Sequence, residues 1–107
     1  VCCISDVVAI GAMQALREKG IRPGQEISII GYDGLELGAW LDPPLTTMHQ
    51  PLKLAGEKLA KMLLNIVESG GLPLNNQELV RASLVRRETA NAPLSTWPPI
   101  RKDSGKP

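Results

Sequence analysis

Residues 27–33 read Ile-Ser-Ile-Ile-Gly-Tyr-Asp, a short β-branched run that meets a glycine and then an acidic residue. A continuous apolar run of this length, bounded by turn-forming residues, is typical of a central strand in a parallel sheet. The sequence therefore predicts a buried strand over Ile27–Ile30 that stops at Gly31.

An earlier apolar run, Val1–Ile4, predicts another buried strand, and the helical segment that follows it ends at Gly20. Ser5 and Asp6 stand where N-cap side chains occur, and a glycine supplies the left-handed turn that often ends a helix. A strand, a helix and a second strand within about thirty residues form a βαβ unit. The expected fold class is therefore α/β with a doubly wound parallel sheet.

The pattern beyond this unit predicts four further segments and a tail. They are a loop or short helix over Asp33–Asp42, an extended piece over Leu45–Met48, a helix over Leu52–Glu68, a strand at about Glu78–Arg87 and a disordered tail from Asn91. The second helix is the clearest of them, because its apolar residues fall on one face and most of its charged residues on the other.

Composition narrows the function classes. The 107 residues carry a formal net charge of +1, which gives no sign of a nucleic-acid surface, so a DNA-binding region would lie outside this chain. No run approaches the roughly 20 apolar residues of a membrane-spanning helix. The adjacent Cys2 and Cys3 favour reduced, structural thiols in a cytoplasmic protein. An apolar start without Met favours a fragment of a longer protein.

Polar side chains follow both strands of the predicted βαβ unit. Ser5 and Asp6 come after the first strand, and Asp33 comes after the second. Because ligands bind outside the carboxyl ends of strands in open α/β sheets, these residues are candidates for one binding site. A carboxylate at Asp33 would accept hydrogen bonds from ligand hydroxyl or N–H groups. The alternatives are that Asp33 only forms a turn and that Ser5 and Asp6 only cap the helix.

No arrangement of residues predicts catalysis, a cofactor or a metal site. His49 is the only histidine and has no serine or cysteine nucleophile near it in sequence, so a hydrogen-bonding or crossover role is favoured over a general base. Gly31 and Gly34 do not form a phosphate-binding glycine loop. The sequence therefore predicts a binding protein and not an enzyme.

Four motifs together resemble the lactose-repressor (LacI/GalR) type of transcriptional regulator. Ser5–Ala12 resembles the family's ND-x-x-A-x-G-A segment, and Ile27–Asp33 resembles its S-V-x-G-Y/F-D strand. Asp42–Pro51 is similar to the PPLTT-x-x-Q crossover, and Leu84–Thr89 to the closing LV-x-R-x-S/T strand. The four occur in the family's order and spacing over about the first ninety residues.

This resemblance implies a type I periplasmic-binding-protein-like core of two α/β subdomains joined by three crossover strands, of which the chain holds a part. The implied divisions are the end of the C-terminal subdomain (1–45), a crossover (46–51), a helix and connection in the N-terminal subdomain (52–77), a closing strand that returns to the C-terminal subdomain (78–90) and a disordered tail (91–107).

The implied function is effector sensing and dimerisation in a cytoplasmic bacterial repressor. Its partners would be a small sugar-like ligand in the cleft between subdomains, a second copy of the protein, and operator DNA bound through a headpiece outside this chain. No membrane partner is expected. The alternative is a periplasmic sugar-binding protein of a transport system, which shares the fold. The sequence upstream would distinguish them, since a repressor has a helix-turn-helix and a transport protein has a cleavable signal peptide.

The resemblance also assigns roles to single residues. Asp33 matches the pocket Asp that contacts the effector, Ser5 stands where many members have an Asn that contacts sugar, and Leu52 falls where some members place an aromatic ring. His49 and Gln50 lie on the crossover, where cleft closure would be felt. The positions that match the family's dimer interface are Ile10, Met13, Arg17, Trp40 and Leu41. For Trp40 and Leu41 the alternative is packing within the domain.

Overall fold

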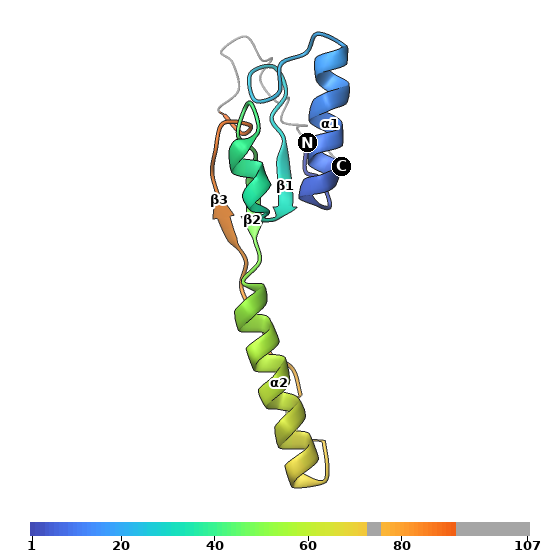
Figure 1. The fold of residues 1–107 in the computed structure, drawn as a ribbon, viewed down its shortest axis with the longest axis vertical. Coiled ribbons are helices and arrows are strands. Elements are labelled where there is room, and N and C mark those ends of the chain that lie inside the picture. Colours follow the sequence, from blue (N-terminus) through green and yellow to red (C-terminus); the bar gives the residue numbers. More distant parts are fainter. Residues whose placement is uncertain (73–75, 92–107) are drawn as a thin grey trace, which may run out of the picture.

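The computed structural model describes residues 1–72 and 76–91, which form a small α/β unit and a helix that extends away from it (Figure 1). Its elements are α1 (Asp6–Glu18), β1 (Ile30–Asp33), the 3-10 helix η1 (Glu36–Trp40), β2 (Thr46–His49), α2 (Leu52–Ser69) and β3 (Ser83–Val85). The α/β class is confirmed. The sheet is mixed, because β2 pairs in parallel with β1 and antiparallel with the returning β3.

The N-terminal segment pairs with β1 but does not form the buried strand that was expected. Cys2 makes a parallel bridge to Ile30, whose amide donates to the Val1 carbonyl at 2.9 Å. Burial of Val1–Ile4 was predicted wrongly, because Val1 is exposed and Ile4 is 85% exposed. Both cysteines are free.

Strand β1 starts three residues later than its apolar run. The Ile27 carbonyl accepts a hydrogen bond from Gly24 at 2.7 Å, and the Ile29 amide donates to Thr89 at 2.7 Å. These bonds hold the first half of the run against the Pro23–Gly24 turn and the C-terminal segment, where Pro23 makes an isolated bridge to Ile27. The predicted strand Ile27–Ile30 is therefore displaced toward Asp33.

Helix α1 has the predicted ends. The Ser5 hydroxyl accepts a hydrogen bond from the Val8 amide at 3.2 Å, and this cap satisfies one of the donors that a helix N-terminus leaves free. Gly20 follows the helix with a φ of +73°, which glycine adopts without strain. The predicted cap at Ser5 is confirmed, whereas Asp6 is the first helical residue.

The core lies between α1 and β1 and is small. It consists of Ala9, Met13, Ile29 and Leu45. Met13, expected at a dimer interface, is only 2% exposed, so its side chain cannot face a partner and that expectation is wrong. Leu41 packs against this core, as its alternative interpretation held, while the neighbouring Trp40 is 84% exposed.

Buried threonines attach the closing segment to the sheet. The Thr89 hydroxyl accepts from the Thr46 amide at 2.8 Å and donates to the Ile29 carbonyl at 2.8 Å. The Thr46 hydroxyl in turn accepts from the Arg87 amide at 2.9 Å. β3 itself is short, but these bonds attach the residues that follow it to the sheet, and they join three segments that are far apart in the sequence.

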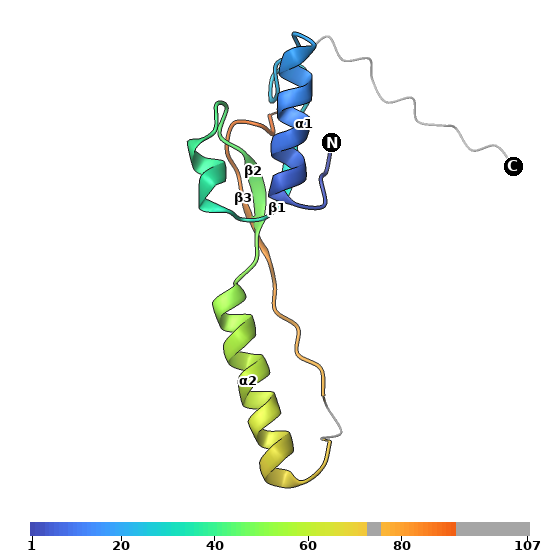
Figure 2. The same ribbon diagram turned by 45° about the vertical axis from the view of Figure 1, so that its right-hand side comes forward.

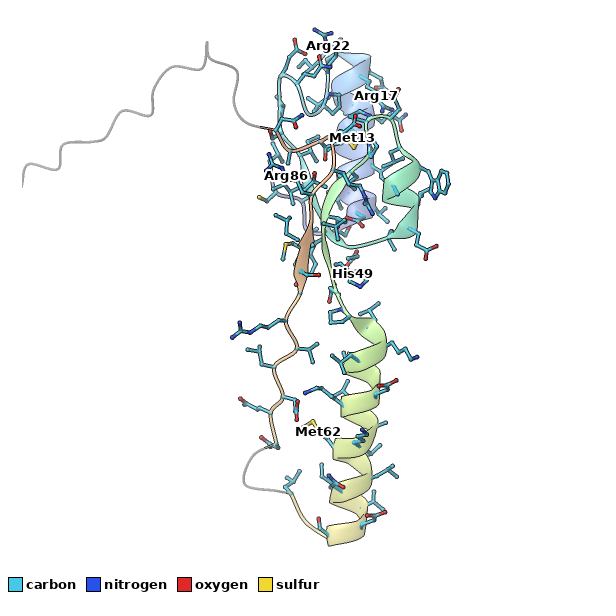
Figure 3. All side chains as sticks on the ribbon, turned by 90° about the vertical axis from the view of Figure 1, so that its left-hand side faces the viewer. Met13, Arg17, Arg22, His49, Met62 and Arg86 are labelled. Carbon is cyan, nitrogen blue, oxygen red and sulfur yellow. The ribbon has the colours of Figure 1, made fainter. Side chains whose placement is uncertain are left out.

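Helix α2 confirms the predicted second helix and lies beyond the end of the sheet, beside the returning residues 76–82 (Figure 2). Lys58 of α2 forms an ion pair with Glu78 of the returning segment, and Met62 points toward the same segment (Figure 3). None of the residues of α2 is buried, and its apolar residues include the exposed Leu59, Leu63 and Val67.

Two expectations from the sequence concern membrane-spanning helices and the C-terminal tail. Within residues 1–72 and 76–91, no helix has the length and apolar character that crossing a bilayer requires. Apart from Asn91, the expected disordered tail lies outside the described residues. The Asn91 side chain donates to the carbonyls of Gly24 and Glu88, at 2.8 and 2.9 Å.

Gly31→Ala should destabilise the full-length protein by about 1–3 kcal/mol, because an added Cβ would overlap the Asp6 carboxylate and lie 3.1 Å from Leu45 Cδ2. The matched variant Gly11→Ala lies on α1 with nothing within 4 Å and should stabilise by roughly 0.5–1 kcal/mol. Urea unfolding measures both. Similar midpoints for the two variants would contradict the packing assigned to Gly31.

Candidate functional site

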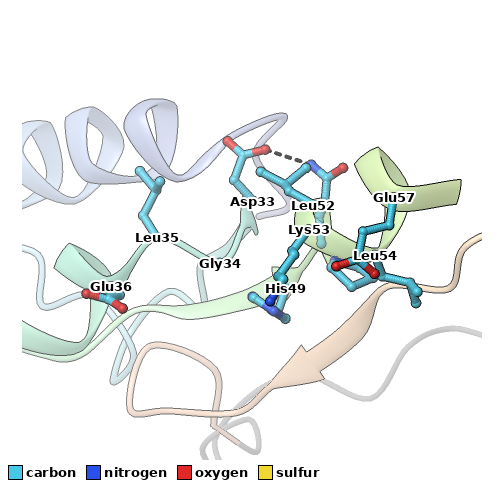
Figure 4. Close-up of a pocket in the computed structure, with 11 residues that line it drawn as sticks. Asp33, Gly34, Leu35, Glu36, His49, Leu52, Lys53, Leu54 and Glu57 are labelled. Carbon is cyan, nitrogen blue, oxygen red and sulfur yellow. Dashed lines mark hydrogen bonds between the residues drawn. The ribbon is translucent and has the colours of Figure 1, made fainter. Parts of the chain in front are cut away.

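A hollow of about 840 Å³ lies between the loop after β1 and the first turns of α2 (Figure 4). Its lining residues are Asp33, Gly34, Leu35, Glu36, His49, Gln50, Pro51, Leu52, Lys53, Leu54 and Glu57. It lies at the carboxyl end of the parallel strands β1 and β2, where ligands bind in open α/β sheets. The volume is within the range of about 300–1,000 Å³ that small-molecule sites have.

The hollow brings together four of the five residues that the resemblance assigned to ligand contact or to the crossover. Asp33, His49, Gln50 and Leu52 all line it. Ser5 does not line it, and its hydroxyl is engaged in capping α1. The structure therefore separates the two strand-end residues that were expected to share a site.

Asp33 is held in an unusual backbone conformation at the edge of the hollow. Its φ is +129°, a region that residues with a Cβ seldom adopt. Its Oδ1 accepts a hydrogen bond from the side-chain Nε2 of Gln50 at 2.9 Å, and its backbone carbonyl accepts one from the backbone amide of Gln50 at 3.3 Å. Among the described residues, Oδ2 has no hydrogen-bond donor, so one carboxylate oxygen is available to a ligand.

Asp6 is the residue whose importance the sequence interpretation missed. It is fully buried, where a charged group is stable only if donors surround it. Its Oδ1 accepts from Thr47 Oγ1 at 2.6 Å, and its Oδ2 accepts from the Leu35 amide at 2.7 Å. The only sign of this buried role in the sequence was the position of Asp6 directly after Ser5. A helix cap explained that position equally well and did not require burial.

The glycine after Asp33 allows the crossover to approach closely. Gly34 has a φ of +80°, and a Cβ there would lie 2.6 Å from Nδ1 and 2.7 Å from Cα of His49. The His49 ring therefore packs over backbone that carries no side chain. This packing holds His49 at the hollow, where the chain leaves β2.

The chemistry of the lining suits binding. It contains no hydroxyl or thiol that could act as a nucleophile and no Phe, Tyr or Trp ring, and Leu52 contributes an apolar side chain that is 67% exposed. The carboxylates of Asp33, Glu36 and Glu57 outnumber the single lysine. Within the part of the chain that the structure describes, no cluster of residues could hold a metal ion. The site can bind a polar ligand by hydrogen bonds.

Residues 1–90 match the family described as a periplasmic binding protein-like domain, so the chain belongs to that family. It is 46% identical over 66 residues to the HTH-type transcriptional repressor PurR of Vibrio atlanticus, covering 62% of this chain and 20% of that protein. It is 40% identical over 89 residues to the lactose operon repressor of Escherichia coli, covering 83% and 24%. Both of these relatives are repressors, and the chain is similar to one part of each.

Two solved structures have the same fold. The chain is 36% identical to the Lac repressor dimer bound to operator and the anti-inducer ONPF, with a TM-score of 0.78 over 85% of this chain and 31% of that one. It is 28% identical to a LacI family transcriptional regulator from Arthrobacter sp. FB24 in complex with lactose, with a TM-score of 0.74 over 84% and 34%. The chain spans about a fifth to a quarter of the length of the two repressors named above.

Gln50→Leu should lower the unfolding free energy of the full-length, ligand-free protein by about 1 kcal/mol, because it removes the donor to the Asp33 carboxylate. Gln25→Leu makes the same change at an exposed position outside the hollow and should have little effect. Urea unfolding compares the two. An equal loss in both variants would show that the bond to Asp33 adds no stability.

Proposed function

We propose that the chain is the effector-sensing and dimer-forming part of a cytoplasmic bacterial transcriptional repressor, and that it binds a small sugar-like ligand in a cleft between two subdomains. The observation that carries this proposal is the Asp33 carboxylate at the edge of a hollow of about 840 Å³, facing the first turns of α2. The LacI-type relatives support a regulator, and the lactose complex supports a sugar.

Asp33 is the principal ligand contact in this proposal. A carboxylate accepts two hydrogen bonds at once, which suits the neighbouring hydroxyls of a sugar, and charged acceptors form the stronger bonds. Leu52 offers an apolar surface to the ligand. Ser5 would contribute only by giving up its bond to the Val8 amide, so its part in the site is secondary.

The exposed apolar residues of α2 support the division into two subdomains. An amphipathic helix is stable when its apolar face is covered, and among the described residues no residue of this helix is fully buried. We therefore assign residues 1–45 to one subdomain, 46–51 to the crossover and 52–77 to the other, with 78–90 returning to the first. The rest of the second subdomain would cover α2 and complete the cleft.

A homodimer fits the surface that η1 and α1 present. Trp40 is almost wholly exposed, Arg17 is exposed and Ile10 is half-buried. Exposed aromatic residues are enriched where proteins associate. The Lac repressor structure, which this chain resembles, is a dimer on its operator. Binding to operator DNA would use a headpiece outside this chain, and the ligand would shift the orientation of the subdomains.

Asp33→Asn should weaken ligand binding by about 1.5–3 kcal/mol and leave operator binding in place, because a charged acceptor is lost from the cleft alone. Asp42→Asn is the matched control, since Asp42 is exposed and lies outside the hollow. A thermal-shift panel of sugars that includes lactose, on the full-length protein, identifies the ligand. Calorimetry and operator titration then compare the variants.

Two results would contradict this proposal. An unchanged ligand affinity in Asp33→Asn would remove Asp33 from the site. Full-length protein that binds sugar but no DNA, and carries a cleavable signal peptide, would indicate a transport protein instead.

Trp40→Ala should raise the dimer dissociation constant at least tenfold, because central aromatic residues often contribute about 2 kcal/mol or more to an interface. Lys61→Ala on α2 is the control and should leave the dimer unchanged. Analytical ultracentrifugation of the full-length protein measures both. A dimer equally stable in both variants would place the interface elsewhere.

A further inference from the structure

We propose that the buried pair Asp6–Thr47 is a positioning device that holds the Asp33 carboxylate in the geometry required for ligand binding. This inference rests on the proposed function, because positioning Asp33 matters for binding only if Asp33 contacts the ligand. Neither Asp6 nor Thr47 lines it, so neither can touch a ligand there. Both act through the two residues that follow Asp33.

The hydrogen bonds run from the pair directly to the backbone after Asp33. The Gly34 amide donates to Thr47 Oγ1 at 3.2 Å, and the Leu35 amide donates to Asp6 Oδ2 at 2.7 Å. The Thr47 hydroxyl donates a hydrogen bond to Asp6 Oδ1 at 2.6 Å. Thr47 is thus at once a donor to the carboxylate and an acceptor for an amide, and only a hydroxyl can fill that place.

Burial makes this arrangement specific. Asp6 and Thr47 are both fully buried. In such surroundings each hydrogen bond is stronger than in water, and an unpaired donor or charge is costly. The pair therefore allows one conformation of the Gly34–Leu35 backbone and opposes others.

That single conformation sets the direction of Asp33. The φ of +129° is unfavourable for an aspartate, so surrounding bonds must maintain it. Asp33 itself pairs with His49 in the β1–β2 ladder, and the amides of Gly34 and Leu35 are held by the buried pair. Without the pair, the backbone after Asp33 is free to relax, and the carboxylate turns away from Gln50 and from the hollow.

Thr47→Val tests the inference, because valine has nearly the shape of threonine but neither donates to Asp6 nor accepts from Gly34. Thr47→Ser keeps the hydroxyl and should retain the wild-type exchange rates and ligand affinity. Ile29→Val is the control for stability alone, since Ile29 is fully buried in the core and belongs to neither the pair nor the hollow.

The first measurement needs no ligand. In the full-length protein, amide hydrogen exchange at Gly34 and Leu35 should become about tenfold faster in Thr47→Val and stay near wild type in Thr47→Ser and Ile29→Val. A crystal structure of ligand-free Thr47→Val should show Asp33 with a changed φ and no bond to Gln50. Slow exchange together with an intact Asp33–Gln50 bond in Thr47→Val would overturn the inference.

The second measurement is titration with lactose. Affinity should fall about tenfold in Thr47→Val, the size expected when a charged hydrogen bond is lost, and remain near wild type in Thr47→Ser and Ile29→Val. An equal loss of affinity in Ile29→Val would mean that stability alone decides binding, and would overturn the positioning role. Wild-type protein that binds no lactose counts against lactose as the ligand, and no binding to any sugar of the panel counts against the proposed function, whereas the exchange rates and the crystal structure still decide the inference.

Discussion

The buried carboxylate of Asp6 is the constraint on which the rest of the structure depends. A buried carboxylate needs hydrogen-bond donors around it, and this one accepts from the Thr47 hydroxyl and the Leu35 amide. It thereby joins the start of α1, strand β2 and the loop after β1 in one network. Gly31 leaves the space that the carboxylate occupies, since any side chain there would overlap it. The carboxyl edge of the sheet, where the candidate site lies, is built around this group.

The same edge is where the two parts of the chain meet. Asp33 belongs to the sheet and Gln50 to the crossover that leads into α2, and two hydrogen bonds join them. In the proposed function a ligand binds the free Oδ2 of Asp33 while Oδ1 accepts from Gln50, so the ligand and the segment that leads into α2 share one carboxylate. A ligand changes the balance between two orientations only if its contacts differ between them. The Asp33 carboxylate, which Gln50 joins to the base of α2, is therefore the point at which our proposed function would couple the ligand to α2.

Much of the fold could be predicted because it depends on local pattern. Both helices have their predicted ends: Ser5 caps α1, and α2 begins at Leu52, as its apolar periodicity indicates. The position of Asp33 at a strand end also follows from the sequence. Burial could not be predicted as well. Val1–Ile4 has a strand-like pattern, yet it makes only one bridge, and all of its residues but Cys3 are exposed, because burial requires neighbours on both sides.

The sequence by itself therefore determined the α/β class, the helices and the position of Asp33 at a strand end, while Gln50 and Leu52 were implied only by the resemblance to a known family. Only the tertiary structure decided which side chains meet there. Asp6 is 41 positions from Thr47 and 29 from Leu35, so no local pattern shows that it is buried against them. Met13 faces the core because Ile29 and Leu45 pack against the same side of α1, which helical periodicity leaves open. Local pattern is read along the chain, whereas burial and buried hydrogen bonds depend on segments that are brought together only by folding.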